Sequence, residues 1–332
     1  MKKRPLYLVL LIALMVAGVS TGHASYTEHP LTRDLIDRMV NKYDFERDEL
    51  EQVFARAERK QSIIDAISRP AEKVKPWKDY RKIFLGEKRI DLGVAFWRRY
   101  RDDLNRAEKT FGVDPAVVVA VIGVETYYGR NKGGFRVIDA LSTLAFDYPP
   151  RSPFFTRELE NFLLLAREQS RDPLALTGSY AGAMGYGQFM PSSYRHYAVD
   201  FDDDGAVDIW DNPVDAIGSV ANYLLRHRWR AGEPVAAPAR LERSKSTLTF
   251  NELQWPESTL AQLGEQGLLP ETKQNPQRVA IPLRLEGKDG DEYWLGFPNF
   301  YVITRYNHSH LYAMAVYQLS ERIRERLGHE AN

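Results

Sequence analysis

A continuous run of apolar residues extends from Ala116 to Val124, within the sequence DPAVVVAVIGVETYYG. Apolar side chains would occupy every face of the helix formed by this run, which is typical of a helix buried on all sides. Asp114 is a good N-cap, and Pro115 suits the first helical position. We therefore expect a buried central helix that begins after Asp114 and is stopped by Gly129.

The rest of the chain is patterned mainly for amphipathic helices. Apolar residues at helical spacing predict helices over residues 32–43, 47–59, 91–111, 135–147 and 154–169, and again over 300–327. Between Pro234 and Pro298, scattered prolines separate short runs such as VAIPLRLEG and DEYWLGF, which indicates strands. We predict an α+β, predominantly helical fold with a helical region at 25–233, a small β-containing insertion at 234–298, and a C-terminal helix at 299–332 that completes the helical domain.

Glu125 would lie at the C-terminal end of the central helix. Apolar surroundings disfavour the charged form of a carboxylate, and so does the negative end of a helix dipole, so both raise its pKa. A glutamic acid that is still protonated near neutral pH can donate its proton to a leaving oxygen. The alternative is a helix-end glutamate that pairs with Arg130 or faces water, and the stretch alone leaves both interpretations open.

Composition removes several classes of function. The chain has 332 residues, of which 44% are hydrophobic, and Lys+Arg and Asp+Glu are equal at 45 each. This is a globular composition without the basic excess of a nucleic-acid-binding protein. The absence of cysteine excludes disulfides, thiol catalysis, thiolate-bound zinc and a lipoprotein anchor.

Residues 1–24, MKKRPLYLVLLIALMVAGVSTGHA, have the features of a secretory signal peptide. A positive start precedes an apolar run, and the small residues Gly22 and Ala24 precede Ser25. The apolar run is short for a membrane span, and no second candidate follows it. We therefore expect a soluble periplasmic protein without a membrane span after the leader is removed.

The glycine-rich stretch GSYAGAMGYGQFMPSSY, from Gly178 to Tyr194, lets backbone approach backbone or ligand closely. It lacks the Gly-Lys-Ser/Thr of a phosphate loop and the preceding strand of a dinucleotide fingerprint, so we expect no organic cofactor. Ser179 is not in a nucleophile elbow. His308 and His310 are two residues apart, where their side chains would diverge on a helix, so a metal site there is not expected.

The sequence DFDDDGAVDIWD, which begins at Asp200, matches the spacing of a calcium-binding loop. Asp200, Asp202 and Asp204 alternate, glycine is sixth, and the carbonyl of Ala206 would be a further ligand. The twelfth position is Asp211, where such loops normally have glutamate. The alternative is an acidic surface turn, but closely spaced carboxylates repel one another without a cation.

Five motifs carry a resemblance to a known family. They are IGVETYYGRNKG, SYAGAMGYGQFMPSSY, the acidic loop, IGSVANYL and TRYNHSHLYAMAV, in this order between Tyr80 and Leu319. Together they resemble the lytic murein transglycosylase B family of bacterial cell-wall enzymes. The resemblance implies a lysozyme-like fold and peptidoglycan glycan strands as substrate. It also implies that the bond between N-acetylmuramic acid and N-acetylglucosamine is cleaved without water, because the muramyl 6-hydroxyl attacks and a 1,6-anhydro product forms.

The resemblance also assigns residues. It places the catalytic acid and base on Glu125 and the last calcium ligand on Asp215, in the first turn of a helix that Pro213 opens, which leaves Asp211 to cap that helix. The calcium ion is expected to be structural. The implied substrate-binding residues are Tyr80, Arg151, Ser179, Gln188, Phe189, Tyr306, Asn307 and Tyr312. Cell-wall synthesis proteins are candidate partners that the sequence does not identify.

Most glycosidases need two carboxylates, yet the acids nearest to Glu125 in sequence are Asp114, Asp139 and Asp147, and none is an obvious second catalytic group. A single glutamate can act first as acid and then as base if the acetamido group of the substrate stabilises the positive charge. Two other interpretations remain at this point: a muramidase-type hydrolase that uses water, and a non-catalytic, calcium-stabilised wall-binding module.

Overall fold

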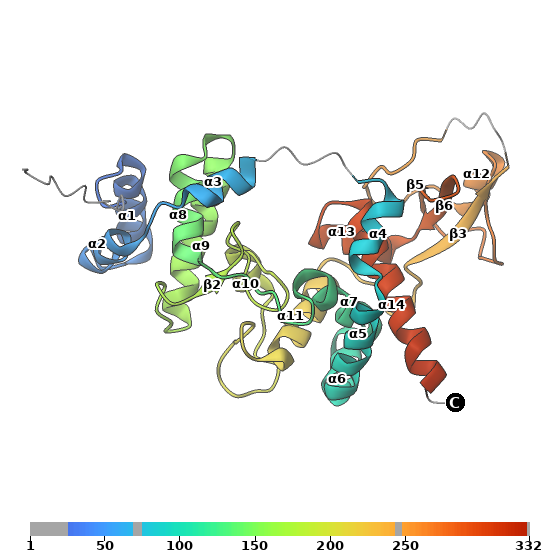
Figure 1. Ribbon diagram of the computed structural model, residues 1–332, viewed down its shortest axis with the longest axis horizontal. Helices are drawn as coiled ribbons and strands as arrows, with labels where there is room; N and C mark the ends of the chain where they lie inside the picture. Colours follow the sequence, from blue (N-terminus) through green and yellow to red (C-terminus); the bar gives the residue numbers. More distant parts are fainter. Residues whose placement is uncertain (1–25, 69–74, 243–247, 331–332) are drawn as a thin grey trace, which may run out of the picture.

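The computed structural model describes residues 26–68, 75–242 and 248–330. The expected signal peptide lies outside these residues. Three helices open the described chain: α1 (Pro30–Tyr43), α2 (Arg47–Arg56) and α3 (Gln61–Ser68). Helices α8 (Val137–Asp147) and α9 (Ser152–Glu168) pack against each other around the short helix η1 (Pro149–Arg151), and α1, α3 and α10 (Pro191–Tyr197) contact this pair (Figure 1).

Helix α7 (Pro115–Thr126) is the centre of the other helical group. It is surrounded by α5 (Glu87–Arg99), α6 (Arg101–Phe111), α11 (Pro213–Arg226) and α14 (His310–Glu330). All its residues from Pro115 to Gly123 are buried, and the side chain of Asp114 accepts a hydrogen bond from the backbone N–H of Ala116. The predicted buried helix and its N-cap are therefore confirmed. The helix ends earlier than expected, because Tyr127 is its left-handed C-cap, two residues before Gly129.

Contacts between one tyrosine ring and two glycines fix the packing around α7. The ring of Tyr128 occupies the space beside Gly93 of α5 and Gly123 of α7, where an added Cβ would lie 2.6 Å from the Tyr128 hydroxyl in both cases. A larger residue at either glycine would push this ring away, since protein interiors are close-packed. The chain that follows Glu125 is therefore held against α5 and α7.

A four-stranded antiparallel sheet lies next to this helical group. Strands β3 (Ala236–Leu241), β4 (Leu268–Pro270), β5 (Ile281–Glu286) and β6 (Asp291–Gly296) are arranged in the order β4-β3-β6-β5. Residues 281, 283 and 285 of β5 are buried while their neighbours are more exposed, as expected of a sheet with one covered face. Helix α12 (Leu260–Glu265) packs on β4, and α4 (Trp77–Phe84) contacts both β5 and α14.

Helix α13 (Pro298–Tyr306) follows β6 and contacts α14 (Figure 1). A second, two-stranded sheet pairs β1 (Phe135–Arg136) with β2 (Thr177–Gly178), which ties the segment after α7 to the start of the glycine-rich stretch. The strands expected between Pro234 and Pro298 are present, and the chain is predominantly helical as predicted. In the described part of the chain, no helix is both long enough and apolar enough to cross a membrane.

Three helix predictions were wrong in their extent. The helix expected over 91–111 is two helices that meet at Tyr100, whose φ of −113° and ψ of 28° are not helical. Basic residues end α5 and acidic residues begin α6, which complements the dipole of each helix, but the apolar spacing continues through the break. The helix expected over 300–327 is likewise divided into α13 and α14 at Asn307, and the one expected over 47–59 ends at Arg56.

Candidate active site and acidic loop

Glu125 lies in the last turn of α7, half-buried, with its carboxyl directed at α14. Its Oε1 accepts a hydrogen bond of 2.6 Å from the hydroxyl of Tyr312, which is 2% exposed. Burial raises the pKa of Glu125 to about 7, and the hydrogen bond from Tyr312 opposes the rise. The alternative ion pair with Arg130 is not formed, and that guanidinium lies 6.0 Å from the ring centroid of Tyr127 instead. The carboxyl is thus able to hold a proton near neutral pH.

Tyrosines from four helices surround Glu125. Burial is the largest cause of the raised pKa of Tyr80, Tyr223, Tyr306 and Tyr312, and the charge of Glu125 adds to the rise in each of them. The rings of Tyr306 and Tyr312 are nearly parallel, 12° apart, with centroids separated by 6.5 Å. Such rings offer both flat apolar faces and hydroxyl groups, a combination that suits a sugar.

Tyr306 is fixed to the glycine-rich stretch. Its hydroxyl donates a hydrogen bond of 2.6 Å to the carbonyl of Gly187, and an added Cβ at Gly187 would lie 2.8 Å from that hydroxyl. Phe189 is 3% exposed and packs under Tyr306 with centroids 5.9 Å apart. Glycine at position 187 therefore allows the close approach, and Phe189 supports the tyrosine from the core.

Ser179 and Gln188 both form hydrogen bonds within the loops. The Ser179 hydroxyl accepts from the backbone N–H of Ala183 at 3.0 Å. Gln188 has a left-handed backbone with φ of 51°, and its Nε2 donates to the carbonyls of Lys132 and Gly185. Both side chains therefore hold the glycine-rich stretch in shape.

A buried threonine connects this stretch to α7. Thr126 is fully buried, and its Oγ1 donates to the carbonyl of Tyr186 at 2.9 Å while it accepts from the N–H of Gly129 at 2.9 Å. The residue after Glu125 thus joins the end of α7 to the loop beneath Tyr306.

Two predicted binding residues lie apart from this group. Arg151 belongs to η1, where its guanidinium lies 4.5 Å from the ring centroid of Phe154 and contacts neither Glu125 nor the tyrosines. Asn307 is exposed at the break between α13 and α14, next to Tyr306. Tyr223, which no local sequence pattern marks, packs on Tyr306 with centroids 4.7 Å apart and donates to the carbonyl of Arg305. It lies in the quoted motif IGSVANYL, so the only available signal was that motif.

The three acids nearest to Glu125 in sequence are engaged elsewhere. Asp114 caps the opposite end of α7 and pairs with Arg324. Asp139 is buried and bonded to Arg136. Asp147 accepts from the Tyr26 hydroxyl at 2.5 Å and lies 3.3 Å from Arg59. Among the described residues, no other carboxylate contributes to the raised pKa of Glu125.

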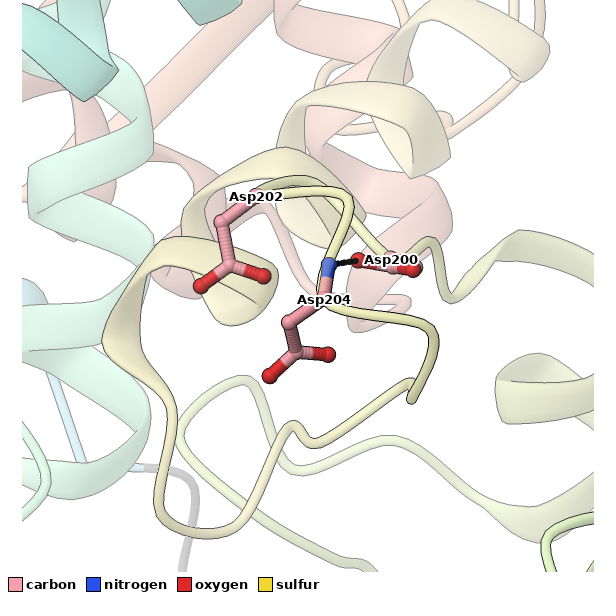
Figure 2. Close-up of side chains that lie close together, drawn as sticks. All are labelled: Asp200, Asp202 and Asp204. Carbon is pink, nitrogen blue, oxygen red and sulfur yellow. Dashed lines mark hydrogen bonds between the residues drawn. The ribbon is translucent and has the colours of Figure 1, made fainter.

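The acidic loop brings three carboxylates together, as Figure 2 shows. One oxygen each of Asp200, Asp202 and Asp204 lies within 4.8 Å of the others. Asp200 accepts from the backbone N–H of Asp204 at 3.1 Å and of Gly205 at 2.8 Å. Gly205 has a φ of +91°, which favours glycine at the sixth loop position. Three converging carboxylates match the oxygen ligands that calcium prefers.

The two candidates for the last ligand differ sharply. Asp215 is fully buried, and its two oxygens accept from the backbone N–H groups of Phe201 and Asp208, each at 2.7 Å. Burial raises the pKa of Asp215, and the charges of Asp202 and Asp200 add to the rise. Asp211 instead points outward, 80% exposed, and pairs with Lys132 at 3.0 Å.

The predicted helix cap at Asp211 was wrong. Asn212 is the N-cap of α11, because its side chain accepts from the backbone N–H of Val214. The Nδ2 of Asn212 also donates to Asp202 at 2.9 Å, so this residue connects the helix start to the acidic loop. Asparagine and aspartate cap helices about equally well, and the position immediately before Pro213 takes the role.

Comparisons with known proteins place these features in a family. The family described as Transglycosylase SLT domain matches residues 27–321. The membrane-bound lytic murein transglycosylase B of Escherichia coli strain K12 is 46% identical over 307 residues, which cover 90% of this chain and 84% of that protein. The crystal structure of soluble lytic transglycosylase SltB1 from Pseudomonas aeruginosa is 52% identical, covers 90% of this chain and 100% of its own, and has a TM-score of 0.85.

Two further structures contain bound groups. The Escherichia coli lytic transglycosylase Slt35 in complex with calcium is 45% identical, covers 91% of this chain and 95% of its own, and has a TM-score of 0.84. SltB3 from Pseudomonas aeruginosa in complex with NAG-NAM-pentapeptide is 30% identical, covers 88% of this chain and 78% of its own, and has a TM-score of 0.78. The lysozyme-like fold that the resemblance implies is confirmed. The chain therefore belongs to the Transglycosylase SLT domain family and is a peptidoglycan lytic transglycosylase.

Proposed function

We propose that this transglycosylase cleaves the β-1,4 bond between N-acetylmuramic acid and N-acetylglucosamine without water and leaves 1,6-anhydromuramic acid ends. The observation that carries this proposal is a single protonatable carboxyl, Glu125, enclosed by tyrosines and without a second carboxylate beside it among the described residues. A classical two-carboxylate mechanism lacks its second group there.

The first step uses Glu125 as a general acid. Its proton passes to the glycosidic oxygen, which leaves as the 4-hydroxyl of N-acetylglucosamine while the bond to C1 of the muramyl residue breaks. The carbonyl oxygen of the muramyl acetamido group bonds to C1 and carries the positive charge as an oxazolinium ion. Glu125 is then a carboxylate.

The second step uses the same residue as a base. The Glu125 carboxylate takes the proton of the muramyl 6-hydroxyl, whose oxygen attacks C1 while the bond from the acetamido oxygen to C1 breaks. The product is the 1,6-anhydro sugar, and Glu125 is protonated again. A pKa near 7 suits a group that must both give and take a proton.

Tyr312 orients the reacting carboxyl, because its hydroxyl donates to Oε1 and its ring is buried. Tyr80 and Tyr306 would contact the sugar, and the packing of Phe189 and Tyr223 on Tyr306 supports this role. Ser179 and Gln188 shape the subsites through the loop that they hold. Asn307 stands at the edge of this group, whereas Arg151 would contact only a more distant part of a long glycan strand.

A calcium ion would be held by Asp200, Asp202, Asp204, the carbonyl of Ala206 and Asp215. The close approach of the three carboxylates supports Asp200, Asp202 and Asp204 as ligands. Asp215 is favoured over Asp211 as the last ligand, because Asp215 is buried against two backbone N–H groups of the loop whereas Asp211 points outward. Each carboxylate oxygen has a second lone pair, so a hydrogen bond does not prevent ligation. The ion would be structural, fixing the loop that follows the glycine-rich stretch.

The enzyme would act in the periplasm as a soluble protein released from its signal peptide. The leader at residues 1–24 and the absence of cysteine support this location. Its partner would be the glycan strands of peptidoglycan. Digestion of purified wall material tests the proposed reaction, because an anhydro end supports it and a reducing end would assign a hydrolase.

A further inference from the structure

A small hollow lies beside the chain that follows Glu125, outside the group of tyrosines described above. Its volume is about 190 Å³, and it is lined by Phe96, Arg99, Tyr100, Tyr128, Arg130 and Tyr186, together with two aliphatic side chains of α5. Arg99 and Tyr100 come from the α5 to α6 junction, while Tyr128 and Arg130 follow the catalytic helix. Tyr186 ties the hollow to the end of α7, because its carbonyl accepts a hydrogen bond of 2.9 Å from Thr126, the residue after Glu125.

The lining is positively charged and contains no acid. Arg99 lies 5.3 Å from the ring centroid of Tyr100, and Arg130 lies 6.0 Å from that of Tyr127. Across the described parts of the chain, neither guanidinium pairs with a carboxylate. The acid that influences Tyr100, Asp103, is itself paired with Arg106 at 3.3 Å. Arg99 interacts with the hydroxyl of Tyr100, and both guanidinium groups line the hollow without a carboxylate partner among the described residues.

The larger basic hollow between α4 and α14 is different. It is lined by Lys78, Arg81, Lys82, Lys288 and Arg322, with Asp79. Four of these cations already have carboxylate partners: Lys78 with Glu286, Arg81 with Glu292, Lys82 with Asp79, and Arg322 with Glu87. Its positive charge is largely neutralised, so it is a weaker candidate for an anionic ligand.

Two features of the smaller hollow define its ligand. Guanidinium groups recognise carboxylates through paired N–H donors. Tyrosine rings can pack against the carbon atoms of the residue that carries the carboxylate. A volume of about 190 Å³ is below the range of roughly 300 to 1,000 Å³ that is usual for a whole small-molecule ligand. The hollow therefore suits one charged residue that is attached to something larger.

We propose that this hollow binds a carboxylate of the stem peptide attached to the glycan strand, through Arg99 and Arg130. This inference rests on the proposed function, because the peptide is delivered by the strand that occupies the active site. The bound ligand of the similar SltB3 structure carries a pentapeptide, and such a peptide ends in a carboxylate unless it is blocked. The site would favour strands that keep their peptides over bare strands.

The test compares two disaccharide-pentapeptides that differ only in charge, one with free peptide carboxylates and one with all of them converted to carboxamides. Affinity is measured by calorimetry with the full-length Glu125→Gln protein, so that the ligand is not cleaved. The carboxylate form should bind about tenfold more tightly, the ratio that roughly 1.4 kcal/mol produces. Raising the salt concentration should reduce the ratio.

Variants assign the preference to the hollow. In the Glu125→Gln protein, adding Arg99→Gln and Arg130→Gln should bring the ratio of the two affinities close to one. Adding Arg99→Lys and Arg130→Lys instead should keep part of the preference, because lysine retains the positive charge but lacks the guanidinium fork. Arg101→Gln, which removes an exposed charge two residues away and outside the hollow, should keep the full ratio. Free pentapeptide should compete weakly, because its carboxylate is not attached to a strand.

Equal binding of the two ligands by the parental protein would overturn the inference, and so would a preference that survives the double glutamine variant. Competition by free pentapeptide as strong as by the disaccharide-pentapeptide would show a separate peptide site. These outcomes are distinct from failure of the proposed function, because the carboxamide ligand still reports glycan binding and the products of the unmodified enzyme report the reaction.

Discussion

The hydroxyl of Tyr312 lies 2.6 Å from Oε1 of Glu125, although the two residues are 187 positions apart in the sequence. Burial raises the pKa of this glutamate to about 7, and the hydrogen bond limits the rise because it favours the charged form. Tyr312 therefore influences the pH at which Glu125 loses its proton.

The pH dependence of activity should reveal this hydrogen bond. Activity should fall as the pH rises through about 7, because the first step needs protonated Glu125. Tyr312→Phe removes a contact that lowers the pKa, so the alkaline limb of the kcat/KM profile should move to higher pH. Tyr317→Phe, on the same helix but packed edge-on against Trp294, is the matched control and should leave the limb in place. An alkaline limb that remains at the same pH or moves to lower pH in Tyr312→Phe would contradict the role of Tyr312 in lowering the pKa of Glu125.

Glu125→Gln should separate binding from chemistry. The amide keeps the shape of the side chain but cannot transfer a proton as the acid does, so cleavage should fall by about 10²- to 10⁴-fold while affinity for glycan strands remains. Turnover of purified peptidoglycan and sedimentation with it measure the two properties. Cleavage within threefold of the parental rate would remove Glu125 from the catalytic role.

Calcium should stabilise the fold. At 100 times its dissociation constant, an ion that binds only the folded state adds about 2.7 kcal/mol to the free energy of unfolding, so the unfolding temperature should rise by several degrees relative to chelator. Asp215→Asn should abolish this difference, and Asp211→Asn should reduce it less. An unfolding temperature that does not respond to calcium would refute the site, whereas the opposite order of the two variants would make Asp211 the last ligand.

Export should remove the leader. N-terminal sequencing of the protein recovered from the periplasm should give a start near Ser25, because Gly22 and Ala24 match the small residues that precede signal-peptide cleavage. An intact Met1, or recovery only with membranes, would show that the apolar segment acts as an anchor.

Local sequence patterns predicted the central helix well and its surroundings less well. Asp114, Pro115 and the apolar run define α7 by themselves, because cap chemistry and full burial are local properties. The break at Tyr100 could not be predicted, because the apolar residues of α6 continue the helical spacing of those in α5. The cap role expected for Asp211 belongs to Asn212, which stands directly before the helix.

The site was predictable only in part because its contacts are long-range. Glu125 could be selected from its helix, but Tyr223 and the support that Phe189 gives to Tyr306 depend on how α11, α13 and the glycine-rich stretch meet. The two arginines of the small hollow, Arg99 and Arg130, are separated by α6 and α7, so no local motif joins them.

The most direct test of the central claim is mass spectrometry of the products that the unmodified enzyme releases from purified peptidoglycan in heavy-oxygen water. Transfer to the muramyl 6-hydroxyl consumes no water, so the products should carry anhydro ends, be lighter by one water molecule than hydrolytic products, and contain no label. Reducing muramyl ends that carry heavy oxygen would contradict the account and identify a hydrolase.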